Sequence, residues 1–156
     1  MARTLHLLKI KVEYEAGHSK VKRIQFDGFD QPVRMGVHTG FSEFYNVVPE
    51  EPLPSSLDYL VAAIGGCMTG TLASALRGRG IESGPDKLTA EVEGQLEEVQ
   101  GSLLLTKVSI SYKLKVPKDK RPAAERALLY HETACPVSAS LKKGIGVEWR
   151  SEIVEE

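Results

Sequence analysis

The run AAIGGCMTGTLASAL, residues 62–76, contains three glycines in a stretch that otherwise favours a buried helix. A glycine in a helix interior costs about 1 kcal/mol relative to alanine, so three of them need a structural reason. Small residues recur at every fourth position and form one face of the helix, here called the small-residue stripe: Ala62, Gly66, Gly70 and Ser74. The other faces are apolar, which is typical of a helix inside a protein. We therefore expect another backbone to pack closely against this helix and offset the cost of its glycines.

The ends of this helix are marked in the sequence. Three prolines at 49, 52 and 54 form a stiff connector, and Ser55 and Asp58 then have the spacing of a capping box. The glycines at 78 and 80 end the pattern, which predicts a helix over 55–77. Because one chain of 156 residues offers few other helices to cover it, we expect a homodimer with this helix or its neighbour near the interface.

The remaining pattern predicts an α+β fold rather than a doubly wound parallel sheet, because the strands come in adjacent antiparallel runs. The first fifty residues indicate a small antiparallel sheet, and two longer strands with a hairpin signal between them follow the central helix. Two helices and a final strand complete the chain, and we expect a single domain over 1–156. The expected segments are strands at 5–14, 20–26, 31–41, 87–96 and 103–116, helices at 119–134 and 135–144, and a last strand at 146–154.

Composition narrows the class of protein. The net charge is -1, charged residues make up 26% and hydrophobic residues 42% of the chain, so nothing indicates a nucleic acid or an anionic membrane as partner. Charged residues interrupt the apolar cluster near the N-terminus before a signal peptide or spanning helix could form. We therefore expect a cytoplasmic protein.

The two cysteines, Cys67 and Cys135, lie 68 residues apart without a CxxC motif, and a cytosolic pair of this kind normally stays reduced. Cys67 lies three turns into the helix, where the helix dipole cannot activate a thiol, so the residues alone favour a small buried filler. Cys135 precedes a proline and can occupy a helix start, where free amides lower a thiol pKa modestly. His131 is four residues earlier, but no metal-ligand spacing accompanies it, which argues against a zinc site of these three side chains.

Two motifs nevertheless resemble one family. The segment PSSLDYLVAAIGGCMTGTLASALRGRGIE is similar to the central helix of the OsmC/Ohr family, the osmotically inducible and organic hydroperoxide resistance proteins. HETACPVSASLKKGIGVEW resembles the second motif of that family, and both occur in the expected order within about residues 50–154. The first fifty residues match only as a β-rich lead-in.

The resemblance implies an OsmC-like fold, in which antiparallel sheets wrap around long central helices in an intertwined homodimer to which residues 1–50 contribute. It also implies thiol-dependent reduction of organic hydroperoxides, and of hydrogen peroxide as a further candidate, without metal, haem or flavin. Cys67 matches the peroxidatic position and Cys135 the resolving position. An external dithiol, either dihydrolipoyl or thioredoxin-like, would restore both thiols.

The sequence departs from the activating pair of that family, which is an arginine of the first hairpin and a glutamate ten residues before the peroxidatic cysteine. Leu57 stands at the glutamate position, and the neighbouring Asp58 is either the acidic partner or a helix cap, with the cap favoured. Arg23 and Arg34 are the candidates for the arginine, although either is also compatible with a solvated strand position.

Two functions from different classes therefore remain. The first is a peroxidase with Cys67 as nucleophile and Cys135 as resolving thiol. The second is a dimeric OsmC-like binding protein with an apolar interface pocket and non-catalytic cysteines.

Overall fold

The computed structural model describes residues 3–154, and the element order is that of an α+β protein, as the sequence predicts. The described chain divides into two compact units. The first consists of the residues up to Val61 together with Gly94–Val108, and the second of Ala62–Glu93 together with the residues from Ser109 onwards. Whether the chain acts as a single domain stays a prediction.

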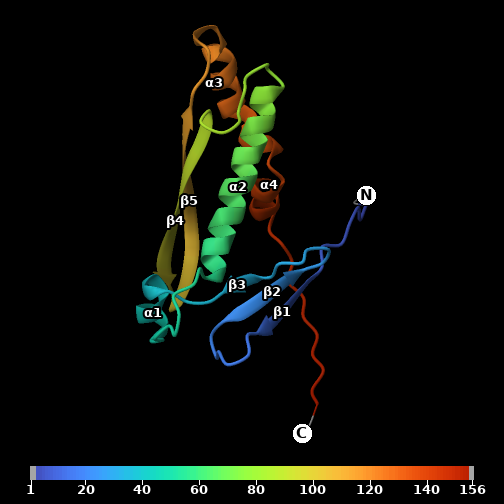
Figure 1. Ribbon diagram of the computed structural model, residues 1–156, viewed down its shortest axis with the longest axis vertical. Helices are drawn as coiled ribbons and strands as arrows, with labels where there is room; N and C mark the ends of the chain where they lie inside the picture. The colour runs from blue at the N-terminus through green and yellow to red at the C-terminus, as the bar shows by residue number, and fades with distance from the viewer. Residues whose placement is uncertain (1–2, 155–156) are drawn as a thin grey trace. The chain divides into compact units, whose positions relative to one another are not determined.

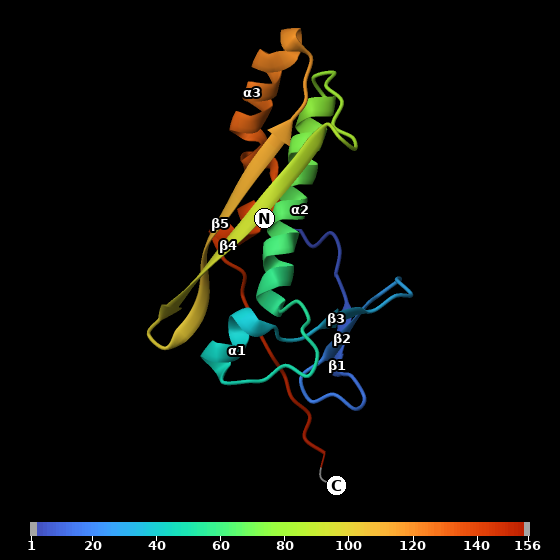
Figure 2. The ribbon, with the colours of Figure 1, turned by 60° about the vertical axis from the view of Figure 1, so that its left-hand side comes forward.

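The first unit contains a three-stranded antiparallel sheet in the order β1-β2-β3 (Figure 2). Its strands are β1 (Ile10–Tyr14), β2 (Lys22–Phe26) and β3 (Val33–Met35). The prediction of a strand over 5–14 is too long at its start, because Ile10 pairs with Phe26 and β2 ends there at a turn. Ile24 in β2 and Val21, the residue before β2, are buried.

A short helix in the first unit was not expected from the sequence. α1 (Thr39–Tyr45) replaces the end of the strand predicted over 31–41. The N-cap is His38, whose ring accepts a hydrogen bond from the Gly40 amide, and Asn46 ends the helix in the left-handed conformation. A histidine is not among the preferred N-cap residues, which is why the sequence pattern did not indicate a helix here.

The central helix α2 (Ser56–Arg77) begins and ends close to the predicted limits. Ser55 and Asp58 form the expected capping box, because each accepts a hydrogen bond from the backbone amide of the other. α2 is long and apolar enough to cross a membrane, but core helices of soluble proteins also meet this criterion. Of its most apolar stretch, 22% is buried.

Close packing against α2 occurs beside the small-residue stripe and not along it. A Cβ atom on Gly65 would lie 2.6 Å from Cγ2 of Val92, so a side chain cannot be added there without a shift. The stripe itself is exposed, and added Cβ atoms on Gly66 or Gly70 would meet nothing within 4 Å. The expected cover of the stripe is therefore not supplied by the described residues of the same chain.

The strands β4 (Leu88–Val99) and β5 (Ser102–Leu114) form a two-stranded sheet (Figure 1). Gln100 and Gly101 connect them, both with positive φ, as two-residue hairpin turns require. In the second unit the C-terminal part of α2 packs with α3 (Arg121–Tyr130) around one apolar cluster. The fully buried members of this cluster are Leu72, Leu76, Ile81, Ala124 and Ala127.

The helix predicted over 119–134 is divided into the 3-10 turn η1 (Lys118–Lys120), α3 and the 3-10 turn η2 (His131–Ala134). The helix predicted over 135–144 is α4 (Pro136–Lys143). The final strand predicted over 146–154 is wrong for this structure, because the segment forms no regular element and pairs with no strand among the described residues 3–154. Its alternating apolar side chains remain exposed, as at Val147 and Trp149.

Candidate functional site

The two cysteines meet in the second unit. Cys67 lies in the middle of α2 and Cys135 is the residue before α4, yet their Sγ atoms are 3.3 Å apart. Both are free thiols at a hydrogen-bonding distance, longer than the S–S bond of about 2.05 Å. Cys135 has no exposed surface, whereas Cys67 is half-buried. Only small displacements therefore separate the reduced pair from a disulfide.

Uncharged groups of α4 and α2 affect the Cys135 thiol. Burial alone would raise its pKa, but the Ser138 amide, the Cys67 side chain, the Val137 amide and the Thr71 side chain lower it. The pKa of Cys135 is therefore lowered from its ordinary value. Cys135 is the N-cap residue of α4, with extended backbone at φ -79° and ψ 114°, and its side chain makes no capping hydrogen bond.

A tyrosine and a histidine lie beside the sulfur pair. His131 is buried, and its Nδ1–H donates to the carbonyl oxygen of Leu128 at 2.8 Å. Its Nε2 lies within hydrogen-bonding distance of the Tyr112 hydroxyl oxygen, at 3.1 Å. Burial and the negative charge of Cys135 raise the pKa of Tyr112, against a hydrogen bond from Thr69. The phenol therefore stays protonated at neutral pH.

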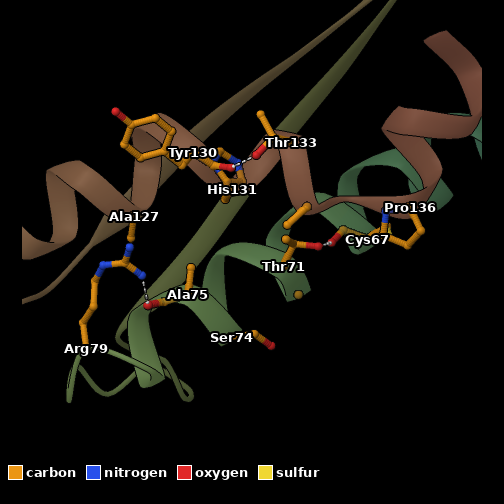
Figure 3. A pocket seen from close by; sticks show the side chains of 12 residues that line it. Cys67, Thr71, Ser74, Ala75, Arg79, Ala127, Tyr130, His131, Thr133 and Pro136 are labelled. Carbon is orange, nitrogen blue, oxygen red and sulfur yellow. Dashed lines mark hydrogen bonds between the residues drawn. The ribbon is translucent and has the colours of Figure 1, made fainter. Parts of the chain in front are cut away.

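Cys67 opens into a cavity of about 780 Å³ in the second unit (Figure 3). One wall is the face of α2 that carries Cys67 and the small residues after it, and the other comes from α3, η2 and the start of α4. Arg79 contributes a guanidinium group, which donates to the carbonyl oxygen of Ala75 at 2.8 Å. The lining residues are Cys67, Gly70, Thr71, Ser74, Ala75, Arg79, Ala127, Tyr130, His131, Thr133, Ala134 and Pro136. A small organic molecule can thus reach the first sulfur while the second stays covered.

Asp58 lies in the first unit, and the contacts it makes there are structural. Its Oδ2 accepts hydrogen bonds from the Ser55 amide at 2.7 Å and the Ser55 hydroxyl at 2.5 Å. His38 Nε2 adds a further contact to the same oxygen at 2.9 Å. Burial would raise the pKa of this carboxyl, but these hydrogen bonds together lower it. The geometry therefore agrees with the helix-cap interpretation of Asp58. The contact between Asp58 and His38 also links the start of α2 to the start of α1.

The two candidate arginines also belong to the first unit. Arg23 is exposed on β2, where its Cα pairs with Glu13 and Arg34 in the sheet register. Arg34 is held by two carboxylates, since its Nη2 lies 2.7 Å from both Glu15 and Glu51. Hydrogen bonds from Arg34 lower the pKa of both glutamates. Arg34 therefore forms an ion-pair network inside the unit that holds Asp58.

Several residues of the sulfur site were missed by sequence reasoning. Thr71 follows Cys67 by four residues and donates to its carbonyl oxygen at 2.9 Å, so helical spacing could have indicated it. In the sequence, Tyr112 is one of several apolar residues in an alternating strand pattern. Nothing in that pattern distinguishes it from the other apolar positions as a residue of the site. Within residues 3–154, no three histidine, cysteine, aspartate or glutamate side chains form a group that could hold a metal ion.

The chain was then compared with known proteins. A family model described as OsmC-like protein matches residues 49–150. No curated protein sequence matches the chain.

Solved structures share the fold at low identity. A hypothetical protein from Aquifex aeolicus VF5 superposes with a TM-score of 0.64 and 16% identity over 89% of either chain. An OsmC-like protein of unknown function from Vibrio cholerae O1 biovar eltor has a TM-score of 0.64 and 13% identity, with 88% of this chain and 93% of that chain covered. An organic hydroperoxide resistance protein from Elizabethkingia anophelis has a TM-score of 0.61 and 10% identity, with 88% and 89% covered. At these identities the likeness shows the fold alone.

Proposed function

Because the chain belongs to the OsmC-like protein family, we propose that it is a thiol-dependent peroxidase that reduces organic hydroperoxides. The observation that carries the proposal is the 3.3 Å contact between two free thiols, of which Cys67 faces a cavity and Cys135 is covered. Two relatives of known structure, from Elizabethkingia anophelis and Bacillus subtilis, are named as organic hydroperoxide resistance proteins, which supports the same class of activity.

The geometry suits a two-step oxidation. The Cys67 sulfur attacks the peroxide, a sulfur–oxygen bond forms, the oxygen–oxygen bond breaks, and an alcohol leaves. The resulting sulfenic acid faces Cys135, whose sulfur forms the disulfide as water departs. An external dithiol, dihydrolipoyl or thioredoxin-like, then reduces the disulfide. The cavity lining places alanine and glycine with few charged groups beside Cys67, which favours an apolar peroxide over hydrogen peroxide.

Thiol counting with cumene hydroperoxide tests the proposal. The reduced protein should lose both thiols for each peroxide consumed, and Cys67→Ser should abolish turnover with thioredoxin or dihydrolipoamide. Ser140→Ala is the matched control, because its hydroxyl bonds only the Pro136 carbonyl on the exposed side of α4. Peroxide consumption by Cys67→Ser at the rate of the unaltered chain would reject the assignment. Unreactive thiols together with a co-purifying apolar molecule would favour the binding-protein alternative.

We further propose that a second copy of the chain covers α2. An apolar helix whose small-residue stripe is exposed requires a partner surface, and the β1 side chains Ile10, Val12 and Tyr14 are also more than half exposed. Sedimentation equilibrium should give twice the chain mass of 17.1 kDa. A monomer at micromolar concentration would contradict the homodimer.

A further inference from the structure

We propose that Arg79 determines which hydroperoxides the protein prefers, by binding a carboxylate at the end of the substrate remote from the peroxide group. The preferred substrate is an organic hydroperoxide in which an apolar chain separates the peroxide from a single carboxylate. The inference rests on the proposed peroxidase function. It starts from the observation that the cavity beside Cys67 contains a guanidinium group that the proposed oxidation does not use.

Arg79 supplies the only permanent charge among the described residues that line the cavity. It follows the end of α2 and is exposed, and its Nη1 donates to the carbonyl oxygen of Ala75 at 2.8 Å. None of the ion pairs formed among residues 3–154 includes Arg79. A guanidinium has five N–H donors, so the remaining ones can bind a carboxylate through two parallel hydrogen bonds.

Three other polar side chains of the cavity already have partners. The Thr71 hydroxyl donates to the Cys67 carbonyl oxygen at 2.9 Å. The Thr133 hydroxyl donates to the Tyr130 carbonyl oxygen at 2.7 Å. Both ring nitrogens of His131 lie within hydrogen-bonding distance of other groups of the protein. An anionic group that enters the cavity therefore finds its strongest free partner at Arg79.

Arg79 and Cys67 lie at opposite ends of the cavity lining (Figure 3). Ala75 holds the guanidinium and follows Cys67 by slightly more than two turns of α2, so at 1.5 Å per residue the two positions are about 12 Å apart along the helix axis. An extended chain advances roughly 1.2 Å per bond, and about ten bonds therefore separate the peroxide from the carboxylate. Gly70 and Ala127 also line the cavity and suit an apolar chain.

The single guanidinium sets the charge of the preferred substrate. A carboxylate carries one negative charge and matches it, whereas a phosphate monoester carries about two at neutral pH. Carbonyl groups at the end of a helix repel an anion, so Arg79 has to supply the attraction alone. Loss of Arg79 should therefore slow the reaction of anionic hydroperoxides and leave neutral ones unaffected.

Single-turnover oxidation tests the charge preference. Reduced protein is mixed with 10-hydroperoxydecanoate or its methyl ester, and the remaining thiols are counted without any external dithiol, so that Arg79 cannot act through the reductant. Arg79→Gln should lower the rate constant for the acid roughly fivefold, the upper end for an exposed ion pair, and leave that for the ester unchanged. An equal loss for acid and ester would make Arg79 a cap of α2 and overturn the inference. An unchanged rate for the acid would overturn it as well.

A shorter substrate and a matched variant test the position of the site. 5-Hydroperoxypentanoate cannot span from Cys67 to Arg79, so its rate should not depend on Arg79. Arg77→Gln removes the same charge from the end of α2, but Arg77 donates to the Ser74 and Ser83 hydroxyls and does not line the cavity. The preference for the acid should remain in that variant. An equal loss of preference in both arginine variants would show general attraction of anions and contradict a site at Arg79.

A binding measurement without peroxide separates failure of this inference from failure of the proposed function. Decanoate should slow the alkylation of Cys67 by N-ethylmaleimide, followed on the Cys67 peptide by mass spectrometry, and decanol should slow it less. In Arg79→Gln the two should protect equally, whereas Arg79→Lys keeps the charge and should retain part of the difference. Equal protection by decanoate and decanol in the unaltered chain would overturn the inference. Protection by decanoate in a chain that no hydroperoxide oxidises would reject the peroxidase and leave the carboxylate site.

Discussion

The two units of the chain use different interactions around their key residues. In the first, charged side chains gather: Arg34 binds two glutamates, and His38 contacts the Asp58 carboxyl at the start of α2. In the second, the two cysteine sulfurs lie 3.3 Å apart, and the groups that lower the pKa of Cys135 are uncharged amides and side chains. The ion pairs of the second unit, such as Arg121 with Glu125, are exposed.

The charged groups and the sulfur pair therefore belong to different units, and Leu57 stands where a family glutamate is expected. Neutral donors in a buried site act more strongly than in water, because the local dielectric constant is low. Although burial raises the pKa of Cys135, uncharged neighbours lower it overall. The charged residues of the first unit have a structural explanation of their own.

The apolar cluster of the second unit gives the prediction with the largest expected effect on stability. Leu76 is fully buried between α2 and α3, so Leu76→Ala should lower the free energy of unfolding by about 2–5 kcal/mol, as large-to-small core substitutions do. Chemical denaturation followed by circular dichroism measures it. Leu129→Ala, at a side chain 69% exposed on α3, is the control and should change little. Equal effects of the two would show that this cluster does not hold the unit together.

The helix start in the first unit should contribute less. Asp58→Ala removes a capping partner and should cost about 1 kcal/mol, typical of a lost N-terminal cap. Because the pKa of Asp58 is lowered in the folded protein, this stabilisation is present above the ordinary aspartate pKa and is lost as pH falls through the lowered value. Denaturation at several pH values, with the exposed Asp30→Asn as control, tests both parts. A cost that persists in acid would contradict the ionic contribution.

The Arg34 network should have the smallest effect. Its guanidinium is about a third exposed, and ion pairs open to water contribute little and are screened by salt. Arg34→Gln should therefore lower stability slightly at low salt and not at high salt, relative to the exposed Arg126→Gln. Because Arg34 lowers the pKa of Glu15 and Glu51, its contribution is present above the ordinary glutamate pKa and falls in acid. A large, salt-independent loss would mean that the first unit depends on this network.

Much of the fold could be predicted because its signals are local. The capping box at Ser55 and Asp58 and the glycines after Arg77 defined α2, and alternation defined β4 and β5. α1 was not predicted because its N-cap residue is a histidine. The final strand was predicted wrongly because an alternating pattern does not show whether another strand is available for pairing.

The site was predictable only in part, for the same reason. A family resemblance pointed to Cys67 and Cys135, but their contact depends on how α4 begins beside α2, 68 residues away. Tyr112 and Thr71 join them through tertiary packing, which periodicity does not encode. The lowered pKa of Cys135 depends in part on the Ser138 and Val137 amides, and no residue type marks such groups in a sequence.

The exposed C-terminal segment has a practical consequence for spectroscopy. The chain contains one tryptophan, Trp149, and that indole is 83% exposed. Its fluorescence should therefore resemble that of free indole in the isolated chain and should change little when the protein unfolds. It will shift to the blue when another surface covers the segment, which makes the native chain its own optical probe of assembly.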